Sequence, residues 1–393
     1  MKKFFKRFGC IVAIALFAAL FLGSACGIFL IYGPMESLRE LWITTAMETY
    51  HHQYLAKWFF PASYITEIVE RNKAQDIDEE IDLSLIHIGD ETATAAPGET
   101  GTGNETAPAG ETGTGSATEP PDENETTGET QSETEPETGT EPEPPKSQEE
   151  LVTIEKFSRK NTQGLSYNAY MMIVEDPSLL RVGVTSRLGK HGDTLRQMCE
   201  HYDAFAGINA AGFTDPEGQG NGAYPEGIVM QDGEVIWNST KGKKHDVIAI
   251  TWDGKLLLKR MTDAELTENN IRDAVEFNPF LIVNGVAAKV GVTGVHPRAA
   301  IGQTADGKFL LLIIDGRSTK SAGATQKDVI EIMLDYGAVN CANLDGGSSA
   351  TMVYQGKLIN KPSSISEMRS IATSFLVLDP VKLLEKERGS TIE

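Results

Sequence analysis

Residues 325–351 read TQKDVIEIMLDYGAVNCANLDGGSSAT, and this stretch decides the fold class. Thr325 with Asp328 three residues later forms a capping box, which is typical of a helix start. Apolar residues then recur at helical spacing until Gly337, a glycine of the kind that ends helices. The strand-like stretch 338–342 follows, and a polar, glycine-rich loop comes directly after it. The stretch therefore predicts a helix that leads into a strand with a polar loop at its end.

The rest of the C-terminal part contains many short strand signals and few helices. Asp-Gly and Asn-Gly pairs separate the apolar runs and are typical of tight hairpins. Further helices are expected after Asp193 and after Thr262. This pattern predicts an α+β fold over residues 151–393, a single domain with a mixed or antiparallel sheet and a few helices. The expected strands are 170–174, 180–184, 247–251, 309–314 and 371–378.

The negative charge is concentrated in one segment. The chain has 35 Lys and Arg against 56 Asp and Glu, a net charge of −21. Residues 90–150 hold 17 of these acids with one lysine, and they contain no Val, Ile, Leu, Met, Phe, Trp, Tyr or Cys. Such a segment cannot build a core, so a disordered acidic linker is expected at 90–150. The folded part lacks a basic excess, which argues against a nucleic-acid partner.

The N-terminus suggests a membrane anchor. Residues 8–32 carry no charge and follow four basic residues, so we expect residues 1–33 to be a cytoplasmic stub and a transmembrane helix. The protein would then be a single-pass protein of the cell membrane, with a membrane-proximal helical segment at 34–89 and the folded domain outside the cell. A cleaved signal peptide is the alternative, because Cys26 follows small residues.

The cysteines of the folded part leave two interpretations open. Cys199 and Cys341 pair outside the cell, or they are two buried thiols.

The most informative polar residues lie after the strand at 338–342. Glycines allow close approach of a backbone to a ligand, and short polar side chains suit sugar hydroxyls or phosphate oxygens. The candidate residues of this loop are Asn343, Asp345, Gly346, Gly347, Ser348 and Ser349.

Other candidates lie at the ends of other strand signals. Asp315 and Arg317 follow the run 309–314, and Arg298 begins another. The two arginines together would form a fork for a phosphate group, whereas a surface ion pair is the alternative for each. Asn209 follows an apolar stretch as a ligand contact or a turn former. His296 is either an acid or a structural residue.

These motifs, in this order, resemble the phosphodiester glycosidase family over about residues 165–378. The matching stretches are Asn209 with Gly212-Phe213, Pro297-Arg298 through Gly302, Asp315-Gly316-Arg317-Ser318, Asn343 through Ser349, Asn360-Lys361-Pro362-Ser363, and Arg369. The chain departs from the family pattern at Ala210, Ala211, Ala299 and Ser348, where the family often has glycine or threonine.

The resemblance implies a hydrolase that cleaves the anomeric C–O bond of sugar-1-phosphodiesters. Asp345 and then Asp315 are the implied catalytic carboxylates, and the arginines would stabilise the leaving phosphate. Substrate-binding roles are implied for Asn209, Gly212, Arg298, Arg317, Asn343, Gly346, Gly347, Ser348, Ser349 and Arg369. The partner would be a sugar phosphate or a polysaccharide of the cell surface or an exopolysaccharide.

No cofactor is required by this chemistry. A divalent cation, calcium or magnesium, held by Asp315 and Asp345 is an open alternative, and the metal remains unknown. Two other functions also remain open: a glycan-binding module without catalysis, and an accessory protein of exopolysaccharide assembly.

Overall fold

The computed structural model describes residues 17, 21–25, 27–29, 31–49, 52–77, 79–89, 146–216 and 220–390. The predicted linker at 90–150 lies almost wholly outside these residues, as does most of the predicted anchor at 8–32. The described residues of 34–89 and 146–390 belong to one compact unit. Its helices and turns are α2 (Glu36–Met47), α3 (Tyr54–Lys57), α4 (Ala62–Asn72), η1 (Leu83–Leu85), α5 (Gln148–Leu151), η2 (Pro177–Leu179), α6 (Leu195–His201), α7 (Asp263–Glu268), α8 (Gln326–Asp335), η4 (Gly347–Ser349) and α9 (Pro380–Ser390).

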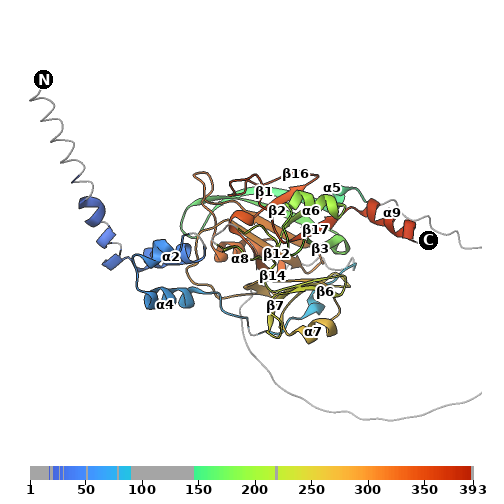
Figure 1. Ribbon diagram of the computed structural model, residues 1–393, viewed down its shortest axis with the longest axis horizontal. Coiled ribbons are helices and arrows are strands. Elements are labelled where there is room, and N and C mark those ends of the chain that lie inside the picture. The colour runs from blue at the N-terminus through green and yellow to red at the C-terminus, as the bar shows by residue number, and fades with distance from the viewer. Residues whose placement is uncertain are drawn as a thin grey trace, which may run out of the picture. The chain divides into compact units, whose positions relative to one another are not determined.

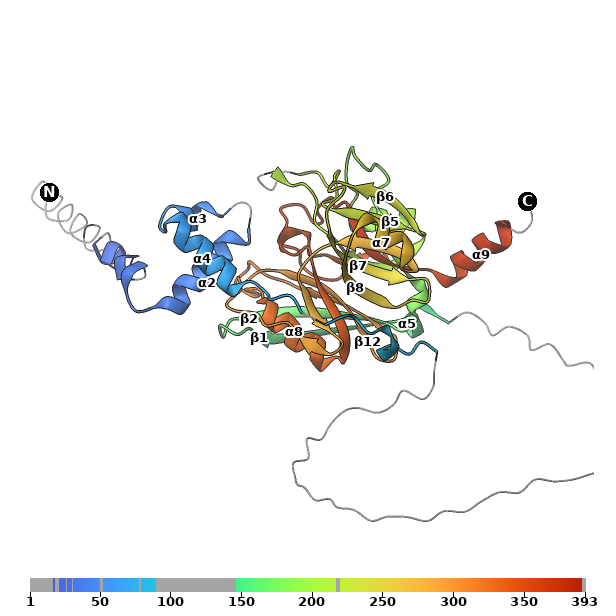
Figure 2. The same ribbon diagram turned by 90° about the horizontal axis from the view of Figure 1, so that it is seen from below.

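Three antiparallel sheets form the body of the unit (Figures 1 and 2). In spatial order, the seven-stranded sheet contains β1 (Val152–Lys160), β2 (Ser166–Val174), β13 (Phe309–Ile314), β12 (Arg298–Thr304), β14 (Ala338–Leu344), β10 (Phe280–Val283) and β11 (Val286–Ala287). The second sheet contains β16 (Lys357–Leu358), β15 (Met352–Tyr354), β4 (Ala204–Asn209), β17 (Thr373–Leu378) and β3 (Leu180–Val184). The third contains β6 (Glu234–Asn238), β5 (Ile228–Gln231), β9 (Ile271–Glu276), β7 (His245–Thr251) and β8 (Leu256–Met261).

The α+β fold class and the antiparallel pairing are thus confirmed. All five predicted strands lie within or largely overlap observed ones, and β3 and β13 have the predicted bounds. Each of the three predicted helices begins at a threonine with a capping box, although α6 is capped by Thr194 and not by Asp193.

Strand β13, an inner strand of the seven-stranded sheet, is buried on both faces. Its residues Phe309, Leu311 and Ile313 pack into the core that the three sheets share. Leu310 and Leu312 point to the other face, against α8. A strand with side chains alternating between two cores has no polar face, which explains its continuous apolar run.

Helices α2 and α4 lie side by side (Figure 2) and share a small apolar core that includes Ile43 and Ile68. The chain then runs along the domain and is held there by backbone hydrogen bonds. Gln75 N–H donates to the Lys289 carbonyl over 2.9 Å, and His87 N–H donates to the Ala305 carbonyl over 2.8 Å.

The predicted membrane anchor requires correction. A bilayer-spanning helix needs about 20 predominantly apolar residues. Within the described ranges, no helix is both long and apolar enough to cross a membrane. Helix α2, the first that is described in full, has 12 residues and carries Glu36, Arg39 and Glu40. The predicted single-pass topology, the membrane contact through residues 8–32 and the extracellular placement are therefore not supported.

Cys199 and Cys341 are free, buried thiols. Of the two open interpretations, the buried-thiol one is correct, because the two cysteines pack in different hydrophobic clusters.

Candidate functional site

The loop after β14 is held by backbone contacts with two other strands. Asp345 N–H donates to the Ala210 carbonyl over 3.0 Å, beyond the end of β4. Gly347 N–H donates to the Pro297 carbonyl, also over 3.0 Å, just before β12. A Cβ at Gly346 would lie 2.5 Å from the Pro297 carbonyl oxygen, so a larger residue does not fit. The prediction was that glycine lets the backbone approach a ligand closely. In the structure, Gly346 lets the loop backbone approach the backbone of Pro297 closely.

The Asp345 carboxyl group has a strongly shifted pKa. Burial raises it to about 7, whereas a hydrogen bond from Ser349 and the charge of Arg369 act in the opposite direction. The nearby carboxylates of Glu226 and Asp215 raise the pKa further. A carboxyl group that titrates near neutrality is suited to proton transfer, and such shifts are concentrated at functional sites.

Asn209 forms hydrogen bonds with both sides of this loop. Its Nδ2 donates to the Asp345 carbonyl over 2.6 Å, and its Oδ1 accepts from Thr351 N–H over 3.0 Å. The residue is 1% exposed. Both ends of the amide are used, so Asn209 positions the loop.

Asn343 lies two residues before Asp345 on β14. Its Nδ2 donates to the Asn278 carbonyl over 3.2 Å. Its Oδ1 is buried and has no hydrogen-bond partner in the described part of the chain. This oxygen remains available to a hydroxyl donor.

Arg317 is the least constrained cation near the loop. Its guanidinium group would lie 3.3 Å from a Cβ at Gly347, and it interacts electrostatically with Asp345. Burial of the group and the charge of Arg298 lower its pKa. Within the described ranges, its side chain forms no hydrogen bond or ion pair. Arg317 also has a φ of 56°, a backbone conformation that is unfavourable for a residue with a side chain.

Arg369 approaches the same loop from another direction. Its Nη1 donates to Ser348 Oγ over 3.1 Å, and its Nη2 contacts Asp215 Oδ2 at 2.6 Å. The guanidinium lies 4.7 Å from the ring centroid of Phe213. Arg369 and Ser348 therefore belong to the surroundings of Asp345.

Glu226 and Asp215 were missed by the sequence analysis. Burial and the charge of Asp215 raise the pKa of Glu226. Glu226 Oε2 would lie 3.3 Å from a Cβ at Gly212, which places the predicted Gly212 at this site. Both acids lie between strands β4 and β5 in a loop without a regular pattern, so only the tertiary fold brings them to Asp345.

Arg298 differs from its predicted role. It is 7% exposed, and its Nη2 forms an ion pair of 2.9 Å with Glu48, which directly follows α2. Its Nε donates to the Ala324 carbonyl over 2.9 Å. Arg298 still acts electrostatically on Arg317, but the Arg298 guanidinium group is held by Glu48 and the Ala324 carbonyl. A two-arginine fork is therefore not formed in this structure.

His296 lies beside this ion pair. Its Nε2 is 3.7 Å from Glu48 Oε2, and both ring nitrogens are buried without a hydrogen bond in the described part. Burial, together with the charges of Arg298 and Arg317, lowers its pKa well below the ordinary range. The imidazole is therefore neutral at pH 7.

The Asp315 carboxylate is hydrogen-bonded to other groups of the protein. Its Oδ1 accepts from Asn360 Nδ2 over 3.0 Å and from Lys361 N–H over 2.9 Å, and its Oδ2 is 3.3 Å from the Tyr170 hydroxyl. Burial raises its pKa. Three protein donors leave little capacity for a substrate or a cation. Across the described residues, no group of three or more His, Cys, Asp or Glu side chains is arranged to hold a metal ion.

Asp345, Arg317, Arg369, Ser348, Ser349 and Glu226 therefore form one polar cluster, called here the Asp345 cluster. It combines a carboxyl group that titrates near neutrality with two cations and a second carboxylate. This combination suits proton transfer beside an anionic group.

Comparison with known proteins supports the resemblance. Residues 202–378 match the family model described as phosphodiester glycosidase. Human N-acetylglucosamine-1-phosphodiester alpha-N-acetylglucosaminidase is 39% identical over 157 residues, and the match covers 35% of this chain and 30% of that protein. The SPbeta prophage-derived uncharacterized protein YomE of Bacillus subtilis (strain 168) is 29% identical over 215 residues, which cover 50% of this chain and 31% of that protein.

Solved structures give a weaker likeness. The catalytic domain of the zebrafish N-acetylglucosamine-1-phosphodiester alpha-N-acetylglucosaminidase, auto-inhibited by its pro-peptide, superposes with a TM-score of 0.48 at 21% identity. The match covers 58% of this chain and 83% of that one.

The alignments with the two curated relatives span less than a third of the length of each. The match at 202–378 includes β4, β14 and the loop that carries Asp345. Residues 202–378 of this chain are thus similar to the domain described by the phosphodiester glycosidase family model.

Proposed function

We propose that this chain hydrolyses sugar-1-phosphodiesters at the anomeric C–O bond and releases a free sugar and a phosphomonoester. The observation that carries the proposal is the Asp345 carboxyl group, with a pKa of about 7, beside the guanidinium of Arg317, which forms no ion pair with any residue that the structure describes. The match to the phosphodiester glycosidase family model also supports a hydrolase-like role. Glycans of the cell surface or exopolysaccharides that contain such linkages are the proposed substrate class.

In this mechanism Asp345 acts as a general base. It accepts a proton from a water molecule, whose oxygen forms the new bond to the anomeric carbon while the bond to the phosphate oxygen breaks. A base is most effective when its pKa is close to the working pH, which a pKa of about 7 satisfies. The carboxylate of Glu226 would stabilise the positive charge that develops on the sugar ring.

The arginines are assigned to the leaving phosphate. The phosphate gains negative charge as the C–O bond breaks, so it leaves without strong help from a general acid. Among the described residues, no carboxylate forms an ion pair with Arg317, so Arg317 would bind the phosphate directly. Arg369, which donates to Ser348 Oγ, would stabilise the phosphate from the other side of the loop. Fixed cations aimed at developing charge typically lower the barrier by a few kcal/mol.

The test is turnover of a panel of methyl phosphodiesters of glucose 1-phosphate, mannose 1-phosphate and N-acetylglucosamine 1-phosphate. Reducing sugar and phosphomonoester should appear in equal amounts. Asp345→Asn should lower kcat by about 10²–10⁴-fold, because the base is lost. Asp335→Asn is the matched control, since Asp335 is an exposed carboxylate that pairs with Arg159 at 2.6 Å. If the wild-type chain releases no sugar from any member but still binds glycans, the binding-module hypothesis replaces this one.

A further inference from the structure

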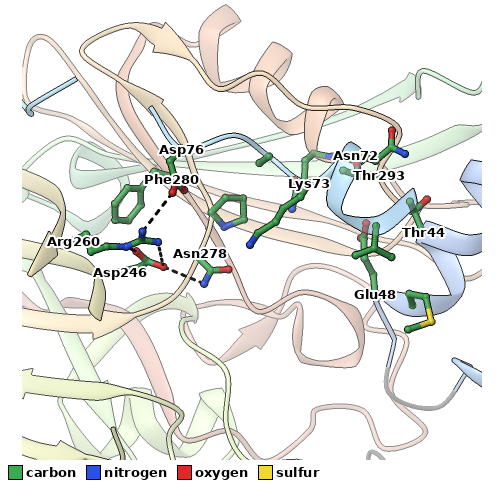
Figure 3. A pocket seen from close by; sticks show the side chains of 15 residues that line it. Thr44, Glu48, Asn72, Lys73, Asp76, Asp246, Arg260, Asn278, Phe280 and Thr293 are labelled. Atoms are coloured by element: carbon green, nitrogen blue, oxygen red, sulfur yellow. Dashed lines mark hydrogen bonds and ion pairs between the residues drawn. The ribbon is translucent and has the colours of Figure 1, made fainter. Parts of the chain in front are cut away.

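A cavity of about 310 Å³ lies outside the Asp345 cluster (Figure 3). It is formed by the ends of α2 and α4 on one side and by the domain on the other. The domain contributes β7, β8, the start of β10 and α8. The volume is at the lower end of the range for small-molecule sites, about 300–1,000 Å³, so it suits a ligand of monosaccharide size.

Most charges that line this cavity are already paired. Arg260 contacts Asp246 through Nε at 2.6 Å, and its Nη1 is 3.4 Å from Asp76. Glu48 is paired with Arg298 at 2.9 Å. In contrast, the ammonium group of Lys73 extends into the cavity and forms no hydrogen bond or ion pair with a described residue (Figure 3). Lys73 thus leaves one positive charge for a ligand to neutralise.

Neutral polar groups line another part of the cavity. Gln326 Oε1 is buried and has no hydrogen-bond partner in the described ranges. A buried acceptor without a partner costs about 1–3 kcal/mol, and a hydroxyl group of a ligand would satisfy it. Thr293 Oγ1 accepts from Gln326 N–H over 2.9 Å, and its own hydroxyl proton can point into the cavity. The Asn278 side chain donates to Asp246 over 3.3 Å, which leaves its Oδ1 as a further acceptor.

An apolar wall completes the site. Phe280 and Pro279 line the cavity together with Met47 and Val69. An aromatic ring bordered by amide and hydroxyl groups matches a sugar, whose ring has apolar C–H faces and polar edges.

We infer that this cavity binds a sugar of monosaccharide size that carries one acidic group. Lys73 pairs with the acidic group, Gln326 and Asn278 accept hydrogen bonds from hydroxyls, and Phe280 packs against a face of the ring. Phosphorylated sugars and sugar carboxylates share this chemistry.

The site is separate from the proposed catalytic centre. None of the residues of the Asp345 cluster lines it. Eight residues that line it come from α2, α4 and the segments that follow them, outside the family match at 202–378: Thr44, Met47, Glu48, Val69, Asn72, Lys73, Ala74 and Asp76. Binding here would therefore be a property that the helical segment adds to the family domain.

Methyl-labelled methionine NMR tests the inference with a local signal. Met47 lines the cavity, so its methyl resonance, assigned through Met47→Leu, should shift when glucose 6-phosphate is added to the full chain. Glucose 6-phosphate and glucuronate are compared with glucose and inorganic phosphate at constant ionic strength. We expect both acidic sugars to bind at least about tenfold more tightly than glucose, because a hydrogen bond to a charged group is lost with glucose.

Variants separate this site from the catalytic one. Lys73→Met should weaken glucose 6-phosphate binding about tenfold or more, and Gln326→Leu should weaken both the acidic sugars and glucose. Lys57→Met is the matched control, because Lys57 is exposed on α3 and donates a hydrogen bond to Gln53, its partner among the described residues. Arg317→Met should leave the Met47 response unchanged, even if the proposed hydrolysis fails. Equal affinity of Lys73→Met and wild type, or a response that disappears in Arg317→Met, would overturn the inference.

Discussion

At the scale of the residue, Asp345 combines a functional advantage with a cost in stability. Its pKa is about 7 in the folded chain, against an ordinary value of 3.8. A folded-state pKa above the unfolded one means that the folded state binds the proton more tightly. The free energy of unfolding therefore falls as the pH rises from about 4 to about 7, because ionisation is disfavoured in the folded state.

Asp345→Asn should consequently stabilise the protein while it removes activity. Asparagine does not ionise, so the gain in Tm over wild type should be larger at pH 8 than at pH 5. Thermal unfolding at the two pH values provides the measurement, with Asp335→Asn as the control. A gain that is equal at both pH values would contradict the raised pKa.

In the wild type, kcat/KM should increase through about pH 7 and then level off, as expected for a base.

Arg317 shows a similar conflict between function and stability. A φ of 56° is unfavourable for arginine and easy for glycine. Arg317→Gly should therefore leave the free energy of unfolding unchanged or raise it by at most about 1 kcal/mol. It should lower kcat/KM for phosphodiesters by about 10²-fold, because the leaving phosphate loses its cation.

Urea unfolding and kinetics on the same samples would check both halves of this prediction. Gln355→Gly is a suitable control, since Gln355 has a φ of 49° in a turn away from the Asp345 cluster. A large loss of stability in Arg317→Gly would show that the arginine has a structural role instead.

At the scale of the element, α2 is attached to the domain through its C-terminal end. Glu48 Oε1 accepts from Gly294 N–H over 2.7 Å, and Oε2 pairs with the buried Arg298 at 2.9 Å. Asn72, the last residue of α4, accepts from Val292 N–H over 2.7 Å. The same short segment, 292–294, thus receives both helices.

Glu48→Ala should destabilise the folded unit by about 2 kcal/mol, because a buried guanidinium loses its counter-ion and a backbone N–H loses its acceptor. Denaturant unfolding monitored by tryptophan fluorescence measures the change. Glu36→Ala is the control: Glu36 pairs with Arg71 at 3.1 Å on the exposed side of α2 and should contribute under about 0.5 kcal/mol. Equal effects of the two substitutions would show that Glu48 does not attach α2.

At the scale of the whole molecule, the three sheets depend on strands buried on both faces. Leu312, on β13 of the seven-stranded sheet, is 0% exposed and packs in a hydrophobic cluster that includes residues of α8. Leu312→Ala should lower the free energy of unfolding by about 2–5 kcal/mol, because the cavity it leaves cannot collapse within a sheet.

Calorimetry measures the change, with Leu384→Ala as the control, because Leu384 is 41% exposed on α9 and its truncation removes the same atoms with little loss of buried packing. A loss below about 1 kcal/mol in Leu312→Ala would indicate that the sheet adjusts around the smaller residue.

The amino-acid sequence determined the local structure and the chemistry of the main loop. Thr325 and Asp328 fix the start of α8 because a capping box involves residues only three apart. Apolar alternation fixes strands such as β13, and the loop at Asp345 is recognisable from its own residues. Such signals need no knowledge of distant parts of the chain.

Only the tertiary structure decided which polar groups meet. Glu226 and Asp215 contribute to the pKa of Asp345, and Glu48 neutralises Arg298, from positions more than 100 residues apart in the sequence. Asp315 was predicted to be catalytic, but its carboxylate accepts hydrogen bonds from the Asn360 side chain and the Lys361 backbone, which the fold brings next to it. Electrostatic interactions and hydrogen bonds depend on distance in space, and residue type alone does not reveal which partner is closest.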